Sequence, residues 1–292
     1  MPPTCPGSVG RRIGQSPRGG GRAGLPARPY VVGVLLVTAV FLGFLTVLFG
    51  GMLVLQMFGQ HLGARRLARG QTTSGEGNAA IEASLFALLG LLIAFTISGG
   101  EARLNVRREL ITREANAIGT AYLRLDLLPE EHQPMLRDEF RRYADARMTY
   151  YAHLLDFKEA RLELRRLHDL QDQIWKDAVN GAADAADSRA TLLVLPALNA
   201  MIDVTTEREA ALRTHVPVTL FLLLVVLAFA CSFFAGLGMA KQGRPSRIHM
   251  VAFSLTLAVT AYVILNLEFP RAGLIRLGGI DSLLAQVRAA MG

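Results

Sequence analysis

The chain has 292 residues, of which 51% are hydrophobic, and it carries a formal net charge of +7. Its mean hydropathy is +0.33, which is more apolar than is usual for a soluble domain of this length. The basic balance does not indicate nucleic-acid binding, because aromatic and basic residues are not interleaved in the way that stacks bases. We therefore expect a membrane protein.

The first 29 residues consist mainly of Gly, Pro and Arg and contain almost nothing that could be buried. Such a composition predicts a disordered basic tail over residues 1–29. An alternative interpretation is that the start codon is misassigned and that translation begins further along the chain.

Four runs are nearly free of charge and long enough to cross the hydrocarbon core of a membrane as helices, namely residues 31–58, 83–100, 216–240 and 248–267. The first run is about twice as long as the apolar core of a signal peptide and lacks an A-x-A-type exit, so we interpret it as a span. The sequence thus predicts an all-α integral membrane protein, with spans one and two within residues 30–100 and spans three and four within residues 216–269.

More Lys and Arg residues lie near the span ends on the side of the N-terminal tail than on the side of Arg65, Arg66 and Lys241. This asymmetry predicts a multi-pass protein whose two termini lie in the cytoplasm. Residues 101–215, between spans two and three, then form a cytosolic domain on the same side. Residues 270–292 are expected to form an amphipathic cytosolic segment.

The long insertion between spans two and three has a helical pattern. No proline interrupts residues 101–128, so span two can continue out of the bilayer as one rod of about 40 Å, which Pro129 ends. An unbroken seven-residue repeat follows and predicts a packing seam, in which Arg147 and Arg161 interrupt the second stripe; its members are Leu136, Tyr143, Tyr150, Phe157 and Leu164. A turn is expected within residues 180–188, and a further helix is expected to begin near Pro196.

Three stretches together resemble a known family: REANAIGTAYLRLDLLP at 113–129, LPALNAMIDVTTEREAALRTHVP at 195–217 and, more loosely, ILNLEFPRAGLIRL at 264–277. They are similar to the bestrophin-like family of bacterial four-span membrane proteins, and the resemblance runs from about residue 31 to the C-terminus. In the third stretch the family usually has two aspartates before the proline, where this chain has Asn266 and Glu268.

The resemblance implies a distant relationship to bestrophins, which are pentameric anion channels in which the second span lines the pore. It places Leu91, Phe95 and Gly99 along the pore as an apolar neck, and it places Arg107 at the family's arginine beyond the membrane. The chain departs from true bestrophins at Gly99, where a bulky apolar residue is usual, and in lacking paired aromatics after that arginine. The implied location is the bacterial inner membrane, and the implied partners are further copies of the chain, the lipid bilayer and small anions.

The physical case for a channel can also be made from the residues. Five copies of Phe95 around one axis would form a constriction that can lose its water, and a vestibule ring of Arg103 and Arg107 would attract anions. Simpler interpretations of these residues exist. Arginines at these positions are also expected from the usual excess of Lys and Arg on the cytoplasmic side of membrane proteins. A stripe of small residues usually indicates close helix packing; here it comprises Ala83, Ala87, Gly90 and Ala94.

The residues of the resembling stretches are expected to form interfaces between helices or subunits. We predict that Glu114, Asn116 and Asp126 pair with basic residues such as Arg208 and Arg213. The remaining positions of this interface set are Gly119, Tyr122, Asn199, Asp203 and Glu268.

The sequence offers little support for an enzyme, since it has no His-Glu-x-x-His motif, phosphate-binding glycine loop or nucleophile elbow. No metal site and no cofactor are expected, and a calcium-binding loop of alternating carboxylates is not present. A transporter or a proton-driven motor subunit is disfavoured because the spans carry no ionisable group at mid-depth. Two hypotheses remain: a homo-oligomeric, anion-conducting channel, or a non-conducting membrane scaffold or signalling protein whose cytosolic helices bind a partner.

Overall fold

A computed structural model of the chain describes residues 27–70, 76–154, 156–187, 189–240, 247–270 and 278–292. The described residues form helices and turns with no strand, which confirms the all-α prediction. Most of the predicted tail, residues 1–26, lies outside the described residues. The elements are α1 (Ala27–Ala68), α2 (Glu76–Arg124), the 3-10 turn η1 (Leu125–Leu127), α3 (Gln133–Ala152), α4 (Phe157–Ala183), α5 (Arg189–Arg213), α6 (Val218–Met239), α7 (Arg247–Glu268) and α8 (Gly278–Ala290).

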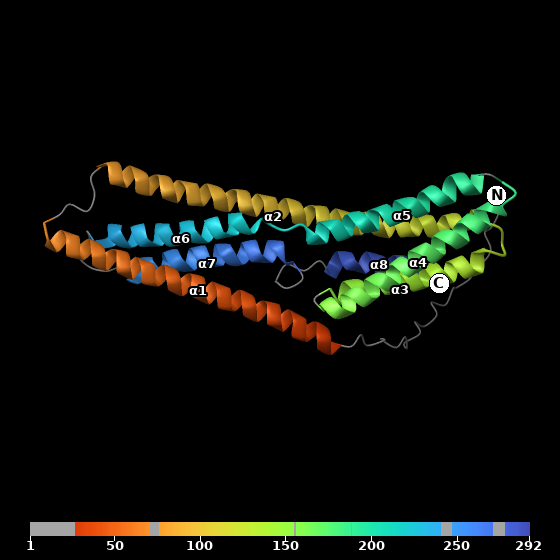
Figure 1. Cartoon of the computed structure of the whole chain (residues 1–292), viewed down its shortest axis with the longest axis horizontal. Helices are drawn as coiled ribbons and strands as arrows, with labels where there is room; N and C mark the ends of the chain where they lie inside the picture. The colour runs from red at the N-terminus through yellow and green to blue at the C-terminus, as the bar shows by residue number, and fades with distance from the viewer. Residues whose placement is uncertain (1–26, 71–75, 155, 188, 241–246, 271–277) are drawn as a thin grey trace, which may run out of the picture.

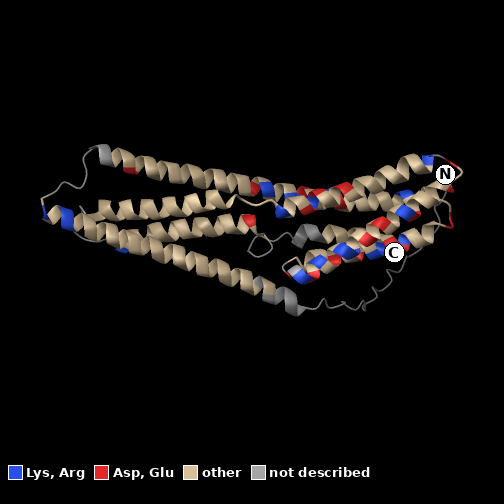
Figure 2. Cartoon of the chain, viewed as in Figure 1, with Lys and Arg blue, Asp and Glu red and all other residues tan. Residues whose placement is uncertain are grey.

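The molecule is elongated and has an apolar half and a polar half (Figure 1). The apolar half contains α1, the first part of α2, α6 and α7, and the polar half contains the rest of α2 with α3, α4, α5 and α8. Charged residues gather in the polar half and at the opposite tip, and few lie between (Figure 2). Four helices are long and apolar enough to cross a membrane, which confirms the predicted number of spans.

Helix α2 joins the two halves without a break. It has 49 residues, which at about 1.5 Å per residue gives a rod of about 73 Å. The helix ends at Arg124 and tightens into η1, a few residues before the predicted stop at Pro129. The expected continuous rod is therefore present, because nothing in residues 76–124 removes a backbone donor.

Glycines allow α1 and α6 to approach closely in the apolar half, where these two helices share their largest contact. A side chain on Gly59 would collide with the Phe233 carbonyl, and one on Gly236 would collide with the backbone of Gln56. Small residues let the two helices pack closely, and this packing holds helices together in lipid, where the hydrophobic driving force between them is weak. The structure thus places the close glycine packing between α1 and α6.

The helices of the polar half differ from the sequence prediction at two places. The seven-residue repeat is broken, because α3 ends at Ala152 and α4 begins at Phe157. Asp156 caps α4 and accepts hydrogen bonds from the backbone N–H groups of Lys158 at 3.1 Å and Glu159 at 3.3 Å. A capping aspartate starts a new helix, and neither Gly nor Pro marks the turn before it, so the periodic pattern did not reveal the break.

Helix α5 begins at Arg189, earlier than predicted, and contains Pro196 in its interior. A proline there removes one backbone hydrogen bond and weakens the turn before it. Arg124 at the end of α2 donates to the Leu193 carbonyl in that turn, at 2.7 Å. The connection between α4 and α5 is shorter than predicted, because α4 continues to Ala183.

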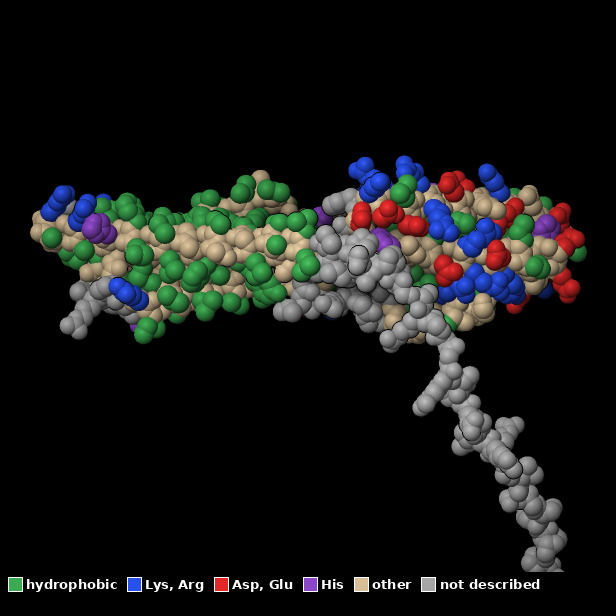
Figure 3. Space-filling model, turned by 90° about the horizontal axis from the view of Figure 1, so that it is seen from below, with side chains coloured by type: hydrophobic (Ala, Val, Ile, Leu, Met, Phe, Trp, Pro, Cys, Tyr) green, Lys and Arg blue, Asp and Glu red, His purple; other side chains and the backbone are tan. Residues whose placement is uncertain are grey.

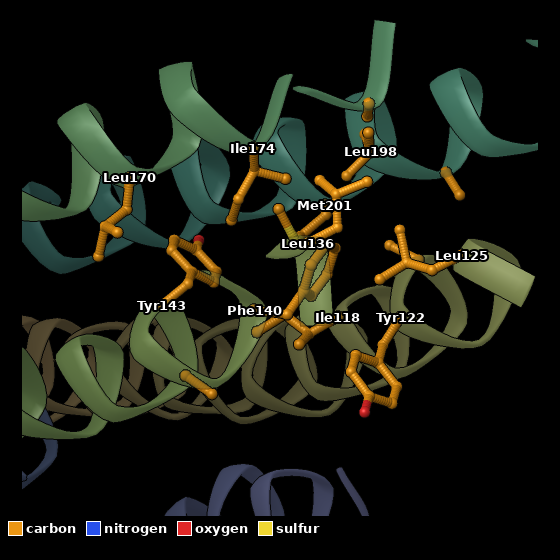
Figure 4. Close-up of a cluster of buried hydrophobic side chains, with 14 of the residues drawn as sticks. Ile118, Tyr122, Leu125, Leu136, Phe140, Tyr143, Leu170, Ile174, Leu198 and Met201 are labelled. Carbon is orange, nitrogen blue, oxygen red and sulfur yellow. The ribbon is translucent and has the colours of Figure 1, made fainter. Parts of the chain in front are cut away.

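The polar half has one large hydrophobic core, to which α2, α3, α4, α5 and α8 contribute. Figure 4 shows side chains from the first four of these helices converging. The labelled residues are Ile118, Tyr122, Leu125, Leu136, Phe140, Tyr143, Leu170, Ile174, Leu198 and Met201. This core fixes the long α2 rod against the shorter helices.

Candidate functional site

The rest of the subunit leaves one side of α2 uncovered within the apolar half. Leu91 is 51% exposed and Phe95 is 65% exposed, and Gly99 one turn further on is partly exposed. The other side of α2 carries Leu89, which is buried against α6. The three residues predicted to line a pore therefore lie on a surface that the rest of the subunit does not cover.

The small residues of α2 lie on uncovered surface as well, since Ala83, Ala87, Gly90 and Ala94 are all exposed. Among the described residues, no neighbouring atom lies within 4 Å of where a Cβ on Gly90 would be. The close packing expected for this stripe does not occur within the subunit. Hydrophobic side chains are spread along the surface of the apolar half seen in Figure 3.

A polar junction lies where the apolar half meets the polar half, and Arg107 of α2 is at its centre. Its guanidinium donates to the carbonyls of Ala211 at 3.2 Å and Thr214 at 2.9 Å, at the end of α5. It also donates to the carbonyl of Glu268, at the end of α7, at 2.9 Å. Arg107 is 5% exposed and thus satisfies the terminal carbonyls of two helices from a third.

Glu268, at the end of α7, is the acceptor at the same junction. Its Oε2 accepts from Arg103 at 2.9 Å, and its Oε1 accepts from the backbone N–H of Val216 at 2.9 Å. The Nδ1 of His215 lies 3.0 Å from the same Oε1, and the His215 ring stacks on Phe269. One carboxylate therefore joins α2, the α5–α6 connection and α7.

The sequence predicted Arg103 and Arg107 as a ring of cations open to a vestibule. In the structure, Arg103 keeps 24% of its side chain exposed and is paired with Glu268, whereas the Arg107 guanidinium is committed to backbone carbonyls. The carbonyls at the ends of α5 and α7 need donors, and α2 brings a long side chain to them. Arg107 therefore supports the junction within the subunit.

A second buried cluster lies further along α2, around Glu114. Its carboxylate pairs with Arg147 of α3, with Nη2 to Oε1 at 2.5 Å, and with Arg208 of α5. Tyr151 donates to Glu114 Oε2 at 3.1 Å, and its ring lies under the Arg208 guanidinium, 3.5 Å from the centroid. Glu209 lies 3.3 Å from Arg147 and balances the second cation. The predicted pair of Glu114 and Arg208 is present, whereas Arg147, which the sequence shows only as an interruption of the second stripe of the repeat, was not predicted as a partner of Glu114.

The charges in this cluster determine its protonation states. Burial raises the pKa of Tyr151 well above its usual value, and the adjacent Glu114 raises it further. Burial alone would lower the pKa of Arg147, but Tyr151 and Glu114 outweigh burial and the pKa is raised. Arg147 thus stays cationic and Tyr151 stays neutral, and the ion pairs of Glu114 with Arg147 and Arg208 cross-link α2, α3 and α5.

Two other predicted partners of the basic residues lie elsewhere. Asn116 is exposed on α2, and neither it nor Arg213 has an ion-pair or hydrogen-bond partner among the described residues. Asp126 pairs with Arg137 of α3. Asn199 and Asp203 are exposed on α5, where the Asn199 amide donates to Asp203 at 2.8 Å. Sequence spacing alone did not distinguish these outward positions from the inward Glu114.

Gly119 and Tyr122 contact α8. The Cβ position of Gly119 would lie 3.9 Å from a methyl of Val287, and the Tyr122 hydroxyl donates to the Met291 carbonyl at 2.9 Å. Arg141 of α3 donates to the same carbonyl at 3.1 Å. These two positions of α2 therefore serve a helix contact within the subunit.

Glu139 of α3 is a buried acid whose nearby donors, Arg142 and Gln173, only partly offset the effect of its burial. It is 0% exposed, and neither of its oxygens accepts a hydrogen bond among the described residues. Burial, followed by the neighbouring carboxyl of Asp177 on α4, raises the pKa of Glu139 to about 7. The two carboxyl groups can share a proton when Glu139 is protonated.

One group in the described part of the chain has the composition of a metal site. The ligand atoms of Glu131, His132 and Asp184 lie within 4.8 Å of one another. His132 Nε2 is 2.9 Å from Asp184 Oδ2, so a hydrogen bond between the start of α3 and the end of α4 already accounts for the arrangement. Glu131 and Asp184 are exposed.

The chain matches one protein family in sequence, and its fold is similar to that of a solved structure. Residues 50–278 match a family model described as a bestrophin-like domain. The fold is similar to the crystal structure of a point mutant of a bacterial bestrophin homologue from Klebsiella pneumoniae, with a TM-score of 0.55 and 18% sequence identity. The alignment covers 84% of this chain and 99% of that chain. No curated protein sequence matches the chain.

Proposed function

Because the chain belongs to the bestrophin-like family, we propose that it is a homo-oligomeric ion channel that conducts anions and whose second span, within α2, lines the pore. The observation that carries this proposal is the uncovered side of α2, on which Phe95 is 65% exposed. A bulky apolar residue in that position is either in lipid or at a shared axis, and the family favours the axis. Leu91 and Gly99 would extend the lining one turn to either side.

The proposed assembly is a pentamer, by resemblance to bestrophins. The uncovered small residues of α2 suit this assembly, because Ala87, Gly90 and Ala94 let a neighbouring helix approach closely. Helices packed in this way around an axis would bring the Phe95 rings together into an apolar constriction. The small residues and the stripe of Leu91, Phe95 and Gly99 lie on partly different faces of α2, so one face would pack against the neighbouring subunit while the other lines the pore.

We further propose that the polar half and both termini lie in the cytoplasm of a bacterial inner membrane, as the Lys and Arg asymmetry favours. The polar half would then extend the pore as a vestibule. Arg103, which is partly exposed, is the arginine of the junction that can act on anions there, and Arg107 would hold the vestibule wall to the spans.

Anion flux from liposomes that contain the purified full chain tests the proposal. Phe95→Ala widens the constriction, so we expect faster chloride flux than in the wild type at matched protein density. Phe58→Ala is the control, because Phe58 of α1 is 57% exposed and lies on a helix that does not line the proposed pore. Its flux should equal that of the wild type.

A cysteine at position 95, in a background without Cys5 and Cys231, gives an independent measure. In a channel it should react with small water-soluble thiol reagents, whereas in lipid it should stay protected. No flux from folded oligomer in any variant, together with a protected cysteine, would overturn the channel and favour the non-conducting scaffold.

A further inference from the structure

We propose that the first two turns of α4 form a binding surface for the anionic headgroups of the bilayer in which the protein lies. The surface, here called the α4 basic face, consists of Lys158, Arg161, Leu162 and Arg165, which together line one shallow hollow. This inference needs only that the protein spans a membrane and does not depend on conduction.

The α4 basic face points away from the protein. Helix α4 packs on α3 and α5 through Leu167, Leu170 and Ile174, which are buried in the core. At 100° per residue, the four residues of the basic face lie on the opposite side of the helix. All four are exposed, so the subunit itself does not use this side.

The cations of this face are not neutralised by the protein. Among the described residues, no ion-pair partner is found for Lys158, Arg161 or Arg165. Of the acids nearby in the sequence, Asp156 caps the helix and Glu163 lies 3.8 Å from Arg166. Glu159, beside Lys158 in the first turn, is exposed and offsets part of the positive charge without forming an ion pair with these cations. The α4 basic face therefore presents three cations that form no ion pair with the described part of the chain, around one apolar side chain.

The position of the face matches the depth of lipid headgroups. The turn between α3 and α4 lies at the end of the polar half that is nearest to the apolar half, level with the start of α1 (Figure 1). Basic residues follow this turn along α4 (Figure 2). Further along the same side of α4, the charges become acidic at Asp169 and Asp172, which are exposed. Positive charge is thus concentrated at the end that faces the membrane.

Headgroup chemistry suits these side chains. Arg binds phosphate oxygens with paired donors, and Lys binds them as a point charge. Anionic lipids concentrate next to juxtamembrane basic residues, and an apolar side chain among the cations adds contact with the interface. Leu162, which is 43% exposed, is such a side chain.

Native mass spectrometry of the full-length protein, titrated with phosphatidylglycerol or phosphatidylcholine, tests the inference by counting bound lipids. The wild type should retain more phosphatidylglycerol than phosphatidylcholine. The double variant Arg161→Gln/Arg165→Gln should weaken phosphatidylglycerol binding roughly 30-fold, because two basic residues near the headgroups are removed. The matched double variant Lys176→Gln/Arg189→Gln removes two exposed charges further from the boundary and should retain phosphatidylglycerol as the wild type does.

Each other outcome overturns the inference. Equal retention of the two lipids would show no preference for anionic headgroups, and equal losses in both double variants would show a general charge effect. Displacement of the lipid by free glycerol phosphate would show a site for soluble phosphate. Size-exclusion profiles and helical circular dichroism establish that both variants are folded, since neither exposed pair contributes to the core.

Discussion

Arg107 of α2 donates a hydrogen bond to the main-chain carbonyl of Glu268 at 2.9 Å, while the side chain of Glu268 binds Arg103, one turn away on the same helix. The end of α7 is thus held to α2 through both its backbone and its side chain. This double attachment lies where the apolar half meets the polar half, and it motivates the first prediction.

Arg107→Ala should destabilise the folded protein by about 3 kcal/mol, because it leaves three buried or partly buried carbonyls without their donor. Arg113→Ala is the control: Arg113 pairs with Glu207 at the surface, where each side chain is about half exposed, and its loss should cost no more than about 1 kcal/mol. Thermal unfolding in detergent, followed by circular dichroism, compares the two. Equal melting temperatures would contradict the structural role of Arg107.

Glu114→Ala should be more damaging, because it leaves Arg147 and Arg208 buried without their shared carboxylate. We expect a loss of about 3–5 kcal/mol. Trp175, the single tryptophan of the chain, lies on α4 and reports on the polar half by fluorescence. Asn116→Ala, on the exposed side of the same helix, should leave the unfolding curve unchanged; a similar loss in both variants would refute the cluster.

Gly59→Ala should disrupt the apolar half, because the added methyl meets the backbone of α6 and overpacking of this kind costs about 1–3 kcal/mol or more. Gly43→Ala on the same helix has no atom within 4 Å of the new methyl and should be tolerated. The fraction of monodisperse protein in size-exclusion chromatography distinguishes them. Comparable yields would show that α1 and α6 can separate freely.

Stability of the polar half should depend on pH through Glu139. Its pKa is about 7 in the folded chain against 4.5 for a free side chain, so between these values the folded state binds the proton more tightly. Its contribution is complete below about pH 4.5, decreases as the pH rises towards 7, and stays constant above that. Acidification through this window should therefore strengthen the contact of α3 with α4.

Glu139→Gln should remove that dependence and should stabilise the polar half at pH 8 by about 1–3 kcal/mol, since a neutral amide replaces a buried anion. Trp175 fluorescence in urea at pH 5 and pH 8 measures both effects. Glu131→Gln, an exposed acid at the start of α3, is the control. An unchanged pH profile in Glu139→Gln would mean that Glu139 stays ionised.

Large parts of this architecture can be predicted from the sequence. The four spans follow from hydropathy, and the α2 rod follows from the absence of proline between residues 76 and 124. The pair of Glu114 and Arg208 follows from charges on two adjacent helices. These features are local, or they depend on one strong pattern.

The rest depends on three-dimensional contacts that residue spacing does not encode. From the sequence, Arg107 looks like any arginine on the cytoplasmic side of a span. It donates to the terminal carbonyls of α5 and α7 because the fold brings the ends of these two helices together beside α2. Arg147 interrupts an apolar stripe, and the sequence does not show which acid pairs with it; it is 1% exposed because Glu114 of another helix compensates its charge. Both the capping role of Arg107 and the burial of Arg147 depend on residues in other helices, so neither can be predicted from the segment that contains the arginine.

The unbroken α2 helix also has a mechanical consequence. A helix without a proline or a bulge resists bending and twisting, so its two ends cannot reorient independently. Any rotation of Phe95 about the helix axis must turn Glu114 with it, against the cross-links to α3 and α5. A torque applied to one half of the molecule would therefore be transmitted to the other through α2, and the contacts of Arg107 lie between the two halves.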